Sequence, residues 1–233
     1  MTRWLVPGAF LAIACTTGVR AQAATSLFTH HPSVRHLLLA LYGLLRTGVA
    51  LAFAAFTIDR SEPHRRSREP VAFIACTVAM LAIAVVTPPT RSTPSALLLI
   101  GDAVAVSGCI WLLASVLVLG RCFGVLPEAR GFVFRGPYRF VRHPIYLGEI
   151  VALVGLAIAS PAPGNVVVLI VFVGAQIART HLEERALSAA FADYTNYAAN
   201  RGRLLPRLQL TDNAAAAGAA LNTRGQGDLV GEK

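Results

Sequence analysis

Long apolar runs alternate with short polar segments along the chain, and this pattern predicts a bundle of membrane-spanning helices. The apolar runs cover residues 4–19, 37–58, 71–87, 95–119, 144–160 and 165–180. A helix of roughly 20 apolar residues crosses the hydrocarbon core of a bilayer. We therefore expect an all-α, polytopic membrane helix bundle of five to six spans. A cytoplasmic amphipathic helix is expected near the C-terminus, over 181–200.

The two ends of the chain differ in character from the middle. Residues 1–24 have a positive start, a short apolar core and small residues at 21–23, so they form either a cleaved signal peptide or a first span. Residues 1–94 are expected to be N-terminal transmembrane helices, and 95–210 a second membrane unit. The tail, 211–233, is rich in Ala, Gly and Asn without periodicity, and we expect it to be disordered.

Composition and charge support a membrane protein and argue against a nucleic-acid partner. The chain is 55% hydrophobic and 14% charged, with a net charge of +9, whereas a soluble domain carries roughly 25% charged residues. Arginine supplies nearly all the positive charge, and it is concentrated in 59–70 and 120–143 between apolar runs. The positive-inside rule therefore places these loops, and everything after 180, in the cytoplasm. No helix-turn-helix or zinc-finger spacing occurs.

Two ionisable residues, Arg46 and Asp102, fall inside apolar runs. Charges within a membrane are costly and are retained when they are paired or functional. We interpret both as members of structural pairs inside the bundle. The four cysteines are scattered without a CxxC, and the histidines have no metal-ligand spacing, so no metal site is expected.

A helical hairpin is predicted to bring two polar clusters together. The runs 144–160 and 165–180 are joined by "PAPG" at 161–164, and each is roughly 25 Å long as a helix. The chain therefore returns to the face that it left, which places Arg142 and His143 near "ARTHLEER" at 178–185. Within that second cluster, Gln176, Arg179, Thr180 and Glu183 share one helix face.

The sequence resembles the isoprenylcysteine carboxyl methyltransferase family over residues 95–207, most closely its bacterial members. The resemblance is carried by "LGRCFGVLPEARGFVFRGPYRFVRHPIYLGE" and, after the hairpin, by "RTHLEERAL" and "YTNYAANRGRLLPRL". Phospholipid N-methyltransferases are more distantly similar. The resemblance implies a methyltransferase-like catalytic membrane domain over 95–210, with S-adenosyl-L-methionine as cofactor and a lipophilic substrate that enters from the bilayer among membrane lipids.

The resemblance also implies roles for individual residues. Arg179 would hold the substrate carboxylate and would be the catalytic residue, and Arg201 would lie on the substrate side as well. The cofactor-binding residues would be Arg130, Gly131, Phe132, Val133, Tyr138, His143, Pro144, Ile145, Tyr146 and Glu183.

These residue types suit such roles. A carboxylate such as Glu183 accepts charge-assisted hydrogen bonds from a cationic cofactor, and the planar fork of Arg179 matches a carboxylate. Pro144 at a helix start would leave neighbouring backbone N–H groups directed at a ligand.

The expected activity is methyl esterification of a lipophilic, isoprenoid-cysteine-like carboxylate. N-methylation of a phospholipid or lipophilic amine is the first alternative; it requires a general base, for which Glu149 or His143 is available. An NADPH-dependent reductase of sterol-type lipids and a non-catalytic membrane protein are further alternatives. The Ala- and Arg-rich composition suggests a bacterium of high GC content, so the expected location is the bacterial cytoplasmic membrane with the site facing the cytoplasm.

Overall fold

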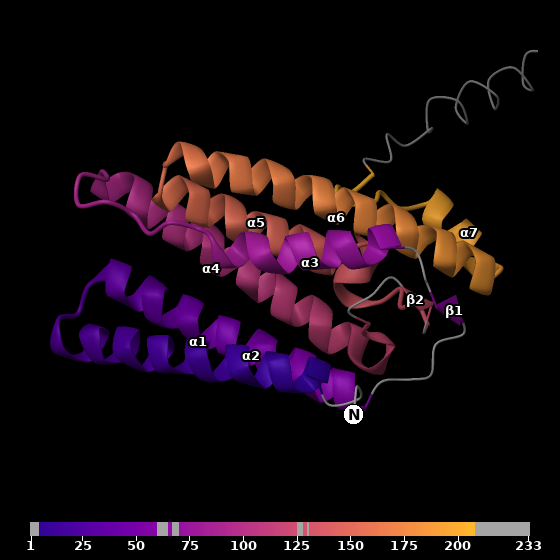
Figure 1. The fold of residues 1–233 in the computed structure, drawn as a ribbon, viewed down its shortest axis with the longest axis horizontal. Coiled ribbons are helices and arrows are strands. Elements are labelled where there is room, and N and C mark those ends of the chain that lie inside the picture. The colour runs from indigo at the N-terminus through magenta and orange to yellow at the C-terminus, as the bar shows by residue number, and fades with distance from the viewer. Residues whose placement is uncertain (1–4, 60–64, 67–69, 125–127, 130, 208–233) are drawn as a thin grey trace, which may run out of the picture.

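The computed structural model describes residues 5–59, 65–66, 70–124, 128–129 and 131–207, and these are mostly helical (Figure 1). The helices are α1 (Leu5–His30), α2 (Val34–Ile58), α3 (Pro70–Ala84), α4 (Ser95–Leu119), α5 (Pro144–Ala159), α6 (Pro163–Ala190) and α7 (Asp193–Ala199). Two short strands, β1 (Arg65–Arg66) and β2 (Glu128–Ala129), pair antiparallel. They join the loop after α2 to the loop after α4. The expected disorder of 211–233 lies outside the described residues.

Three helices of the described chain are long and apolar enough to cross a membrane: Val34–Ile58, Ser95–Cys122 and Pro163–Ala190. Shorter apolar helices cover Pro70–Ala79 and Pro144–Ala159. These helices support an integral membrane protein, and the number of five to six spans stays a prediction. The first apolar run is longer than expected, since α1 continues to His30, and it is not among the three helices.

Close helix pairs build the bundle: α1 packs on α2, α2 on α4, α4 on α5, and α3 on α6 (Figure 1). The α4–α5 pair depends on glycine, because the two backbones approach too closely for a side chain. A Cβ atom at Gly155 would lie 2.3 Å from the backbone nitrogen of Ala105, and one at Gly148 would lie 2.8 Å from that of Leu112. Small residues are what permits such close contact between helices in a membrane.

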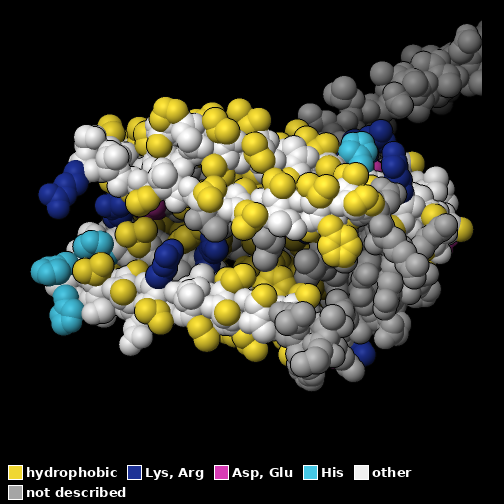
Figure 2. All heavy atoms as spheres, in the orientation of Figure 1, with side chains coloured by type: hydrophobic (Ala, Val, Ile, Leu, Met, Phe, Trp, Pro, Cys, Tyr) yellow, Lys and Arg dark blue, Asp and Glu magenta, His cyan; other side chains and the backbone are white. Residues whose placement is uncertain are grey.

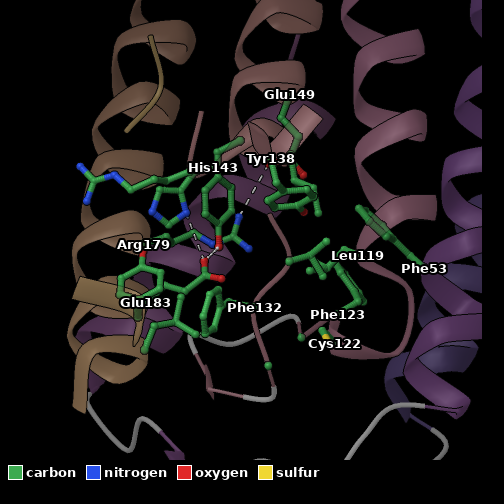
Figure 3. Close-up of a pocket in the computed structure, with 18 of the residues that line it drawn as sticks. Phe53, Leu119, Cys122, Phe123, Phe132, Tyr138, His143, Glu149, Arg179 and Glu183 are labelled. Carbon is green, nitrogen blue, oxygen red and sulfur yellow. Dashed lines mark hydrogen bonds and ion pairs between the residues drawn. The ribbon is translucent and has the colours of Figure 1, made fainter. Parts of the chain in front are cut away.

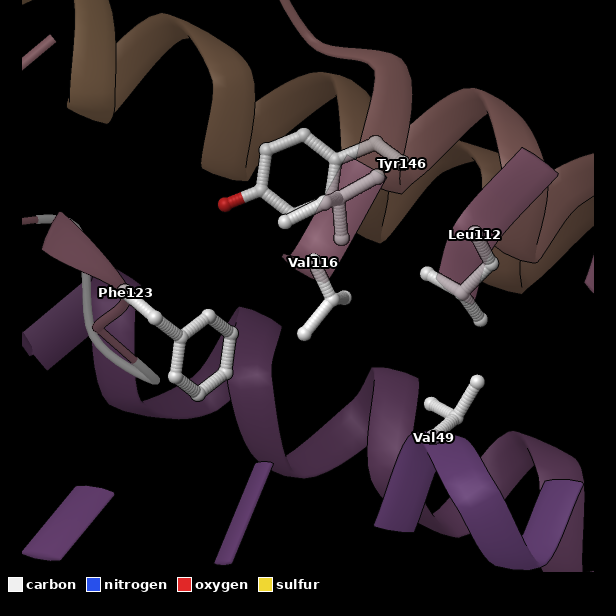
Figure 4. Packing of buried hydrophobic residues seen from close by; sticks show 6 residues of the cluster. Val49, Leu112, Val116, Phe123 and Tyr146 are labelled. Carbon is white, nitrogen blue, oxygen red and sulfur yellow. The ribbon is translucent and has the colours of Figure 1, made fainter. Parts of the chain in front are cut away.

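A buried apolar cluster fixes α5 against the rest of the bundle (Figure 4). Val49 of α2, Leu112 and Val116 of α4, and Phe123 after α4 pack with Ile145 and Tyr146 at the start of α5. Val116 is completely buried. The first turn of α5 is therefore held by packing on α2 and α4.

The predicted hairpin is confirmed. α5 ends at Ala159, and α6 begins at Pro163 and runs back beside it. Asn165 fixes the reversal, because its side-chain amide donates to the carbonyls of Ser160 (2.8 Å) and Thr87 (3.1 Å) and its oxygen accepts from the Thr87 N–H (2.9 Å). The turn is thereby tied to the loop after α3.

The C-terminal region differs from the expected separate amphipathic helix over 181–200. α6 continues through Thr180 without a break to Ala190, and the short α7 follows. The apolar stripe does not lie free on a bilayer surface. Leu187 and Tyr194 are buried against Ala129 and Phe132, so this stripe covers the loop between α4 and α5.

Of the two charges inside apolar runs, Asp102 has the predicted ion pair, whereas Arg46 contacts a neutral side chain of its own helix. Asp102 of α4 pairs with Arg35 of α2 at 3.4 Å, and the Asp102 side chain is 8% exposed. Arg46 donates to the Tyr42 hydroxyl one turn earlier at 3.0 Å. The four cysteines are free thiols, and Cys76 and Cys109 are buried.

Candidate functional site

A cleft opens where the start of α5, the second half of α6 and the loop after α4 meet (Figure 3). It holds about 940 Å³ of empty space, part of which is open to the surroundings. Polar side chains from α5 and α6 form one wall, and apolar side chains from α1, α2 and the end of α4 form the other. The mixed polar and apolar lining is typical of a site for a small organic ligand.

Most residues that the resemblance assigns to a site line this one cleft. They are Gly131, Phe132, Val133, Tyr138, His143, Ile145, Tyr146, Arg179 and Glu183. Pro144 is fully buried as the first residue of α5 and does not line the cleft. Arg201 is also outside the lining, because its Nε donates to the Arg139 carbonyl (3.2 Å) and its guanidinium lies over the Tyr197 ring. Arg130 lies outside the described residues.

Glu183 is held at the cleft by His143, which directly precedes α5, and by Tyr146 in the first turn of α5. The Tyr146 hydroxyl donates to Oε2 of Glu183 at 2.8 Å, and Nδ1 of His143 lies 3.7 Å from the same oxygen. The rings of His143 and Tyr146 stack with their centroids 5.6 Å apart. The Glu183 side chain is 26% exposed, so it keeps acceptor capacity for a further donor.

Glu184, the next residue, points away from Glu183 and interacts with two arginines and a histidine. Oε1 of Glu184 lies 3.0 Å from NH1 of Arg142 and 3.0 Å from Nε2 of His143. Oε2 receives NH2 of Arg203 at 2.6 Å, and NH1 of Arg203 also donates to His181 at 2.9 Å. The hydrogen bonds to Glu184 raise the pKa of Arg203 above its ordinary value. Since Nε2 of His143 is directed at Glu184, Nδ1 is the ring nitrogen that faces Glu183.

The segment after α7 completes this arrangement through the backbone. The N–H of Arg142 donates to the Gly202 carbonyl at 2.9 Å, and that of His143 donates to the Arg203 carbonyl at 3.0 Å. The expectation that the His143 N–H is directed at a ligand is therefore wrong. The C-terminal segment satisfies this donor, and the side chain of His143 is the part that faces the cleft.

Arg179 lies deeper in the cleft within a buried polar group. Its NH1 donates to Gln176 at 2.9 Å and lies 3.8 Å from Oε2 of Glu149, while its guanidinium covers the Tyr146 ring at 4.7 Å. Gln176 is fully buried and also donates to Glu149. Arg179 therefore presents a positive charge to the cleft next to a carboxylate.

Two buried polar groups of the cleft lining have no hydrogen-bond partner among the described residues. They are Nε of Arg142 and the hydroxyl of Tyr194. Buried polar groups are nearly always satisfied, so these two donors are candidates for contacts with a polar ligand that enters the cleft. Burial also raises the pKa of Tyr138 well above its ordinary range and that of Tyr197 to about 12. Both phenols stay neutral at physiological pH.

The apolar wall is a series of aromatic rings that reaches the N-terminal helices. Phe10 of α1 packs edge-on against Phe53 of α2 with centroids 5.2 Å apart, and Phe53 stacks on Phe123 at 4.5 Å. All three line the cleft together with Leu119. The N-terminal helices, for which the sequence offered no motif, therefore form part of the cleft.

Sequence reasoning missed three residues at this site: Arg142, Glu184 and Arg203. The hairpin prediction places Arg142 near 178–185 but gives it no role, and its signal is its place directly before His143. Glu184 was visible only as the second of two adjacent glutamates. Arg203 gave no signal, because its role depends on how the segment after α7 folds back on the start of α5.

Comparison with known proteins finds a similarity to a methyltransferase family in the middle of the chain. Residues 90–194 match the model of the phospholipid methyltransferase family. Over 113 residues the chain is 28% identical to the cobalt-zinc-cadmium resistance protein CzcN of Cupriavidus metallidurans, an alignment that covers 48% of this chain and 49% of that protein. The chain thus spans about half the length of this curated relative. The matched region includes α4, α5, α6 and all cleft residues between Leu119 and Tyr194.

Proposed function

Because residues 90–194 match the phospholipid methyltransferase family, we propose that this protein is an S-adenosyl-L-methionine-dependent membrane methyltransferase that esterifies a lipophilic carboxylate. The observation that carries the proposal is the polar wall of the cleft. There Glu183 keeps acceptor capacity beside two unsatisfied donors, Nε of Arg142 and the Tyr194 hydroxyl. A cofactor with an ammonium, a carboxylate and a ribose diol offers partners for both kinds of group.

The residues present fit this cofactor. Glu183 would accept from its ammonium or hydroxyl groups, and Arg142 would donate to its carboxylate. The Phe132 and Tyr138 rings line the same cleft and supply apolar surface for an adenine. When bound, S-adenosyl-L-methionine supplies a methyl group on a positively charged sulfur. Glu184 takes no direct part, since its oxygens are occupied by Arg142, His143 and Arg203.

Arg179 would receive and orient the acceptor. A carboxylic acid is ionised at neutral pH, so the protein need not remove a proton but must align the carboxylate and exclude water from it. The guanidinium of Arg179 is fixed by Gln176 and by the Tyr146 ring, and that fixed position suits alignment. The aromatic wall of Phe10, Phe53 and Phe123 would contact the acceptor's hydrocarbon part.

One observation favours a second candidate, N-methylation of a phospholipid or another lipophilic amine. The Glu149 carboxylate lines the cleft 3.8 Å from Arg179. An ammonium must lose a proton before it can accept a methyl group, and a buried carboxylate at this place could take that proton.

A transfer assay separates these two candidates. Purified protein would be incubated with methyl-labelled cofactor and a lipid extract, and the labelled product would be treated with base. An ester releases its label with base, whereas an N-methyl group keeps it. A protein that binds a nicotinamide cofactor but not S-adenosylhomocysteine would refute both candidates.

Two variants test whether Glu183 binds the cofactor and Arg179 binds the acceptor. We expect the main effect of Glu183→Gln to be weaker binding of S-adenosylhomocysteine. We expect Arg179→Lys, which keeps the charge but loses the planar fork, to lower turnover of a carboxylate while binding stays largely intact. Equal loss of S-adenosylhomocysteine binding in both variants would show that Arg179 belongs to the cofactor side.

We further propose that the cleft faces the cytoplasm. The loops at the cleft end of the helices carry most of the arginines, whereas 161–164 carries none. Reporter fusions after residue 207 and within 88–94 would test this orientation. The proposal requires a cytoplasmic signal from the first fusion and an external signal from the second.

A further inference from the structure

Arg46 is a charged residue near the middle of a helix that is long and apolar enough to cross the membrane. It lies twelve residues from either end of Val34–Ile58, which is about 18 Å from each end of the helix. An ionisable residue at this depth is costly and is retained for a partner or a function. The partner that the structure gives Arg46 is the neutral Tyr42 hydroxyl, at 3.0 Å.

The charge of Arg46 is not neutralised by an ion pair within the described part of the chain. Asp102, the acidic residue of α4, is already paired with Arg35 at 3.4 Å. Glu149 acts on Arg46 only at longer range and lies 3.8 Å from Arg179. A tyrosine hydroxyl and ring offer a partial partner for a guanidinium. The binding of one anionic group beside Arg46 would therefore neutralise its charge.

The position of Arg46 connects it to the wall of the cleft. Arg46, Val49 and Phe53 lie on one face of α2, since they are spaced by three and four residues. Val49 packs in the cluster with Tyr146, and Phe53 lines the cleft. Arg46 thus extends this face by two turns beyond Phe53. Figure 2 shows a hollow between the α1–α2 pair and the helices above it, with Lys or Arg side chains at its edge.

We propose that Arg46, with Tyr42, binds the ionised carboxyl group of a single-chain lipophilic acid in the hollow between the α1–α2 pair and the helices above it. A phospholipid headgroup is the less suitable occupant, because it stays at the membrane surface and Arg46 is at mid-depth. A single-chain acid can place its carboxylate there while its chain lies among apolar helices. The planar guanidinium fork matches a carboxylate. This site is distinct from Arg179 and needs no methyl transfer.

The test uses a matched pair of probes on the full-length protein in detergent micelles. One is a hexadecanoic acid with a photoreactive group near its carboxyl end, and the other is its methyl ester. At a pH at which the acid is ionised, we expect the acid to label peptides from 34–58 or 95–119. We expect the methyl ester to label the same peptides about tenfold less than the acid, because the ester lacks the negative charge.

Three variants locate the site. Arg46→Gln should reduce labelling by the acid to the level of the ester, and Arg46→Lys should keep part of it. Arg179→Gln should leave unchanged the part of the labelling that Arg46→Gln removes. The proposal fails if acid and ester label wild-type protein equally, if Arg46→Gln labels like wild type, or if labelling is confined to 163–190. The acid–ester comparison decides even if Arg46→Gln does not fold. S-adenosylhomocysteine binding, measured in parallel, tests the proposed methyltransferase activity separately.

Discussion

Gly148 allows the helix that carries the site to pack against α4, and replacing it with alanine should weaken the fold measurably. A Cβ atom at this position would lie 2.8 Å from the backbone nitrogen of Leu112 and 2.9 Å from its Cα. Carbon atoms in good contact are about 3.5–4.0 Å apart, so α4 and α5 would have to separate by about 0.6 Å or more. Backbone atoms cannot turn aside as a flexible side chain can. Overpacking of this kind costs about 1–3 kcal/mol.

Gly174 of α6 is the matched control, because a Cβ atom there meets nothing within 4 Å. Both substitutions gain the same helix propensity, about 1 kcal/mol, so the difference between Gly148→Ala and Gly174→Ala isolates the steric cost. We expect Gly148→Ala to be less stable than Gly174→Ala by about 1–3 kcal/mol. The measurement is reversible unfolding in mixed micelles with increasing sodium dodecyl sulfate. Equal stability of the two variants would refute the close α4–α5 contact.

Three further substitutions or conditions test the site and the fold. Tyr146→Phe removes the 2.8 Å hydrogen bond to Glu183, and S-adenosylhomocysteine affinity should fall about tenfold; unchanged affinity would contradict the role of this pair. Asn165→Ala should lower the free energy of unfolding by about 2 kcal/mol or more, because the buried Asn165 amide holds Thr87 and the hairpin turn. A variant as stable as the wild type would argue against that turn. Burial raises the pKa of Tyr197 to about 12, so its contribution to stability should be lost as pH rises from about 10 towards 12. Ultraviolet titration of tyrosinate checks this, and ionisation of Tyr197 near pH 10 in the folded protein would contradict it.

The hairpin and the polar wall could be predicted because they follow from local geometry. Two apolar runs of similar length joined by a Pro- and Gly-containing turn return the chain to one face. That reasoning brought His143 and Glu183 together, and the structure places Nδ1 of His143 3.7 Å from the Glu183 carboxylate. Helical periodicity also placed Gln176, Arg179 and Glu183 on one face, and Arg179 and Glu183 line the cleft.

The parts that could not be predicted depend on contacts between segments far apart in the chain. The apolar stripe after 180 has the periodicity of a membrane-surface helix, but Leu187 and Tyr194 are buried against Ala129 and Phe132. Periodicity shows that a face is apolar and does not show what covers it. Likewise, nothing near Phe10 in the sequence indicates that its ring packs on Phe53 at the cleft.

The two adjacent glutamates show why the polar wall needs the C-terminal segment. Neighbouring residues on a helix point about 100° apart, so Glu183 and Glu184 cannot both face the cleft. Glu183 faces it and meets Tyr146, whereas Glu184 faces Arg203 and Arg142. His143 lies between the two carboxylates, with Nε2 on Glu184 and Nδ1 towards Glu183. The orientation of the ring at the cleft is therefore set on its far side, by a glutamate that the segment after α7 holds in place.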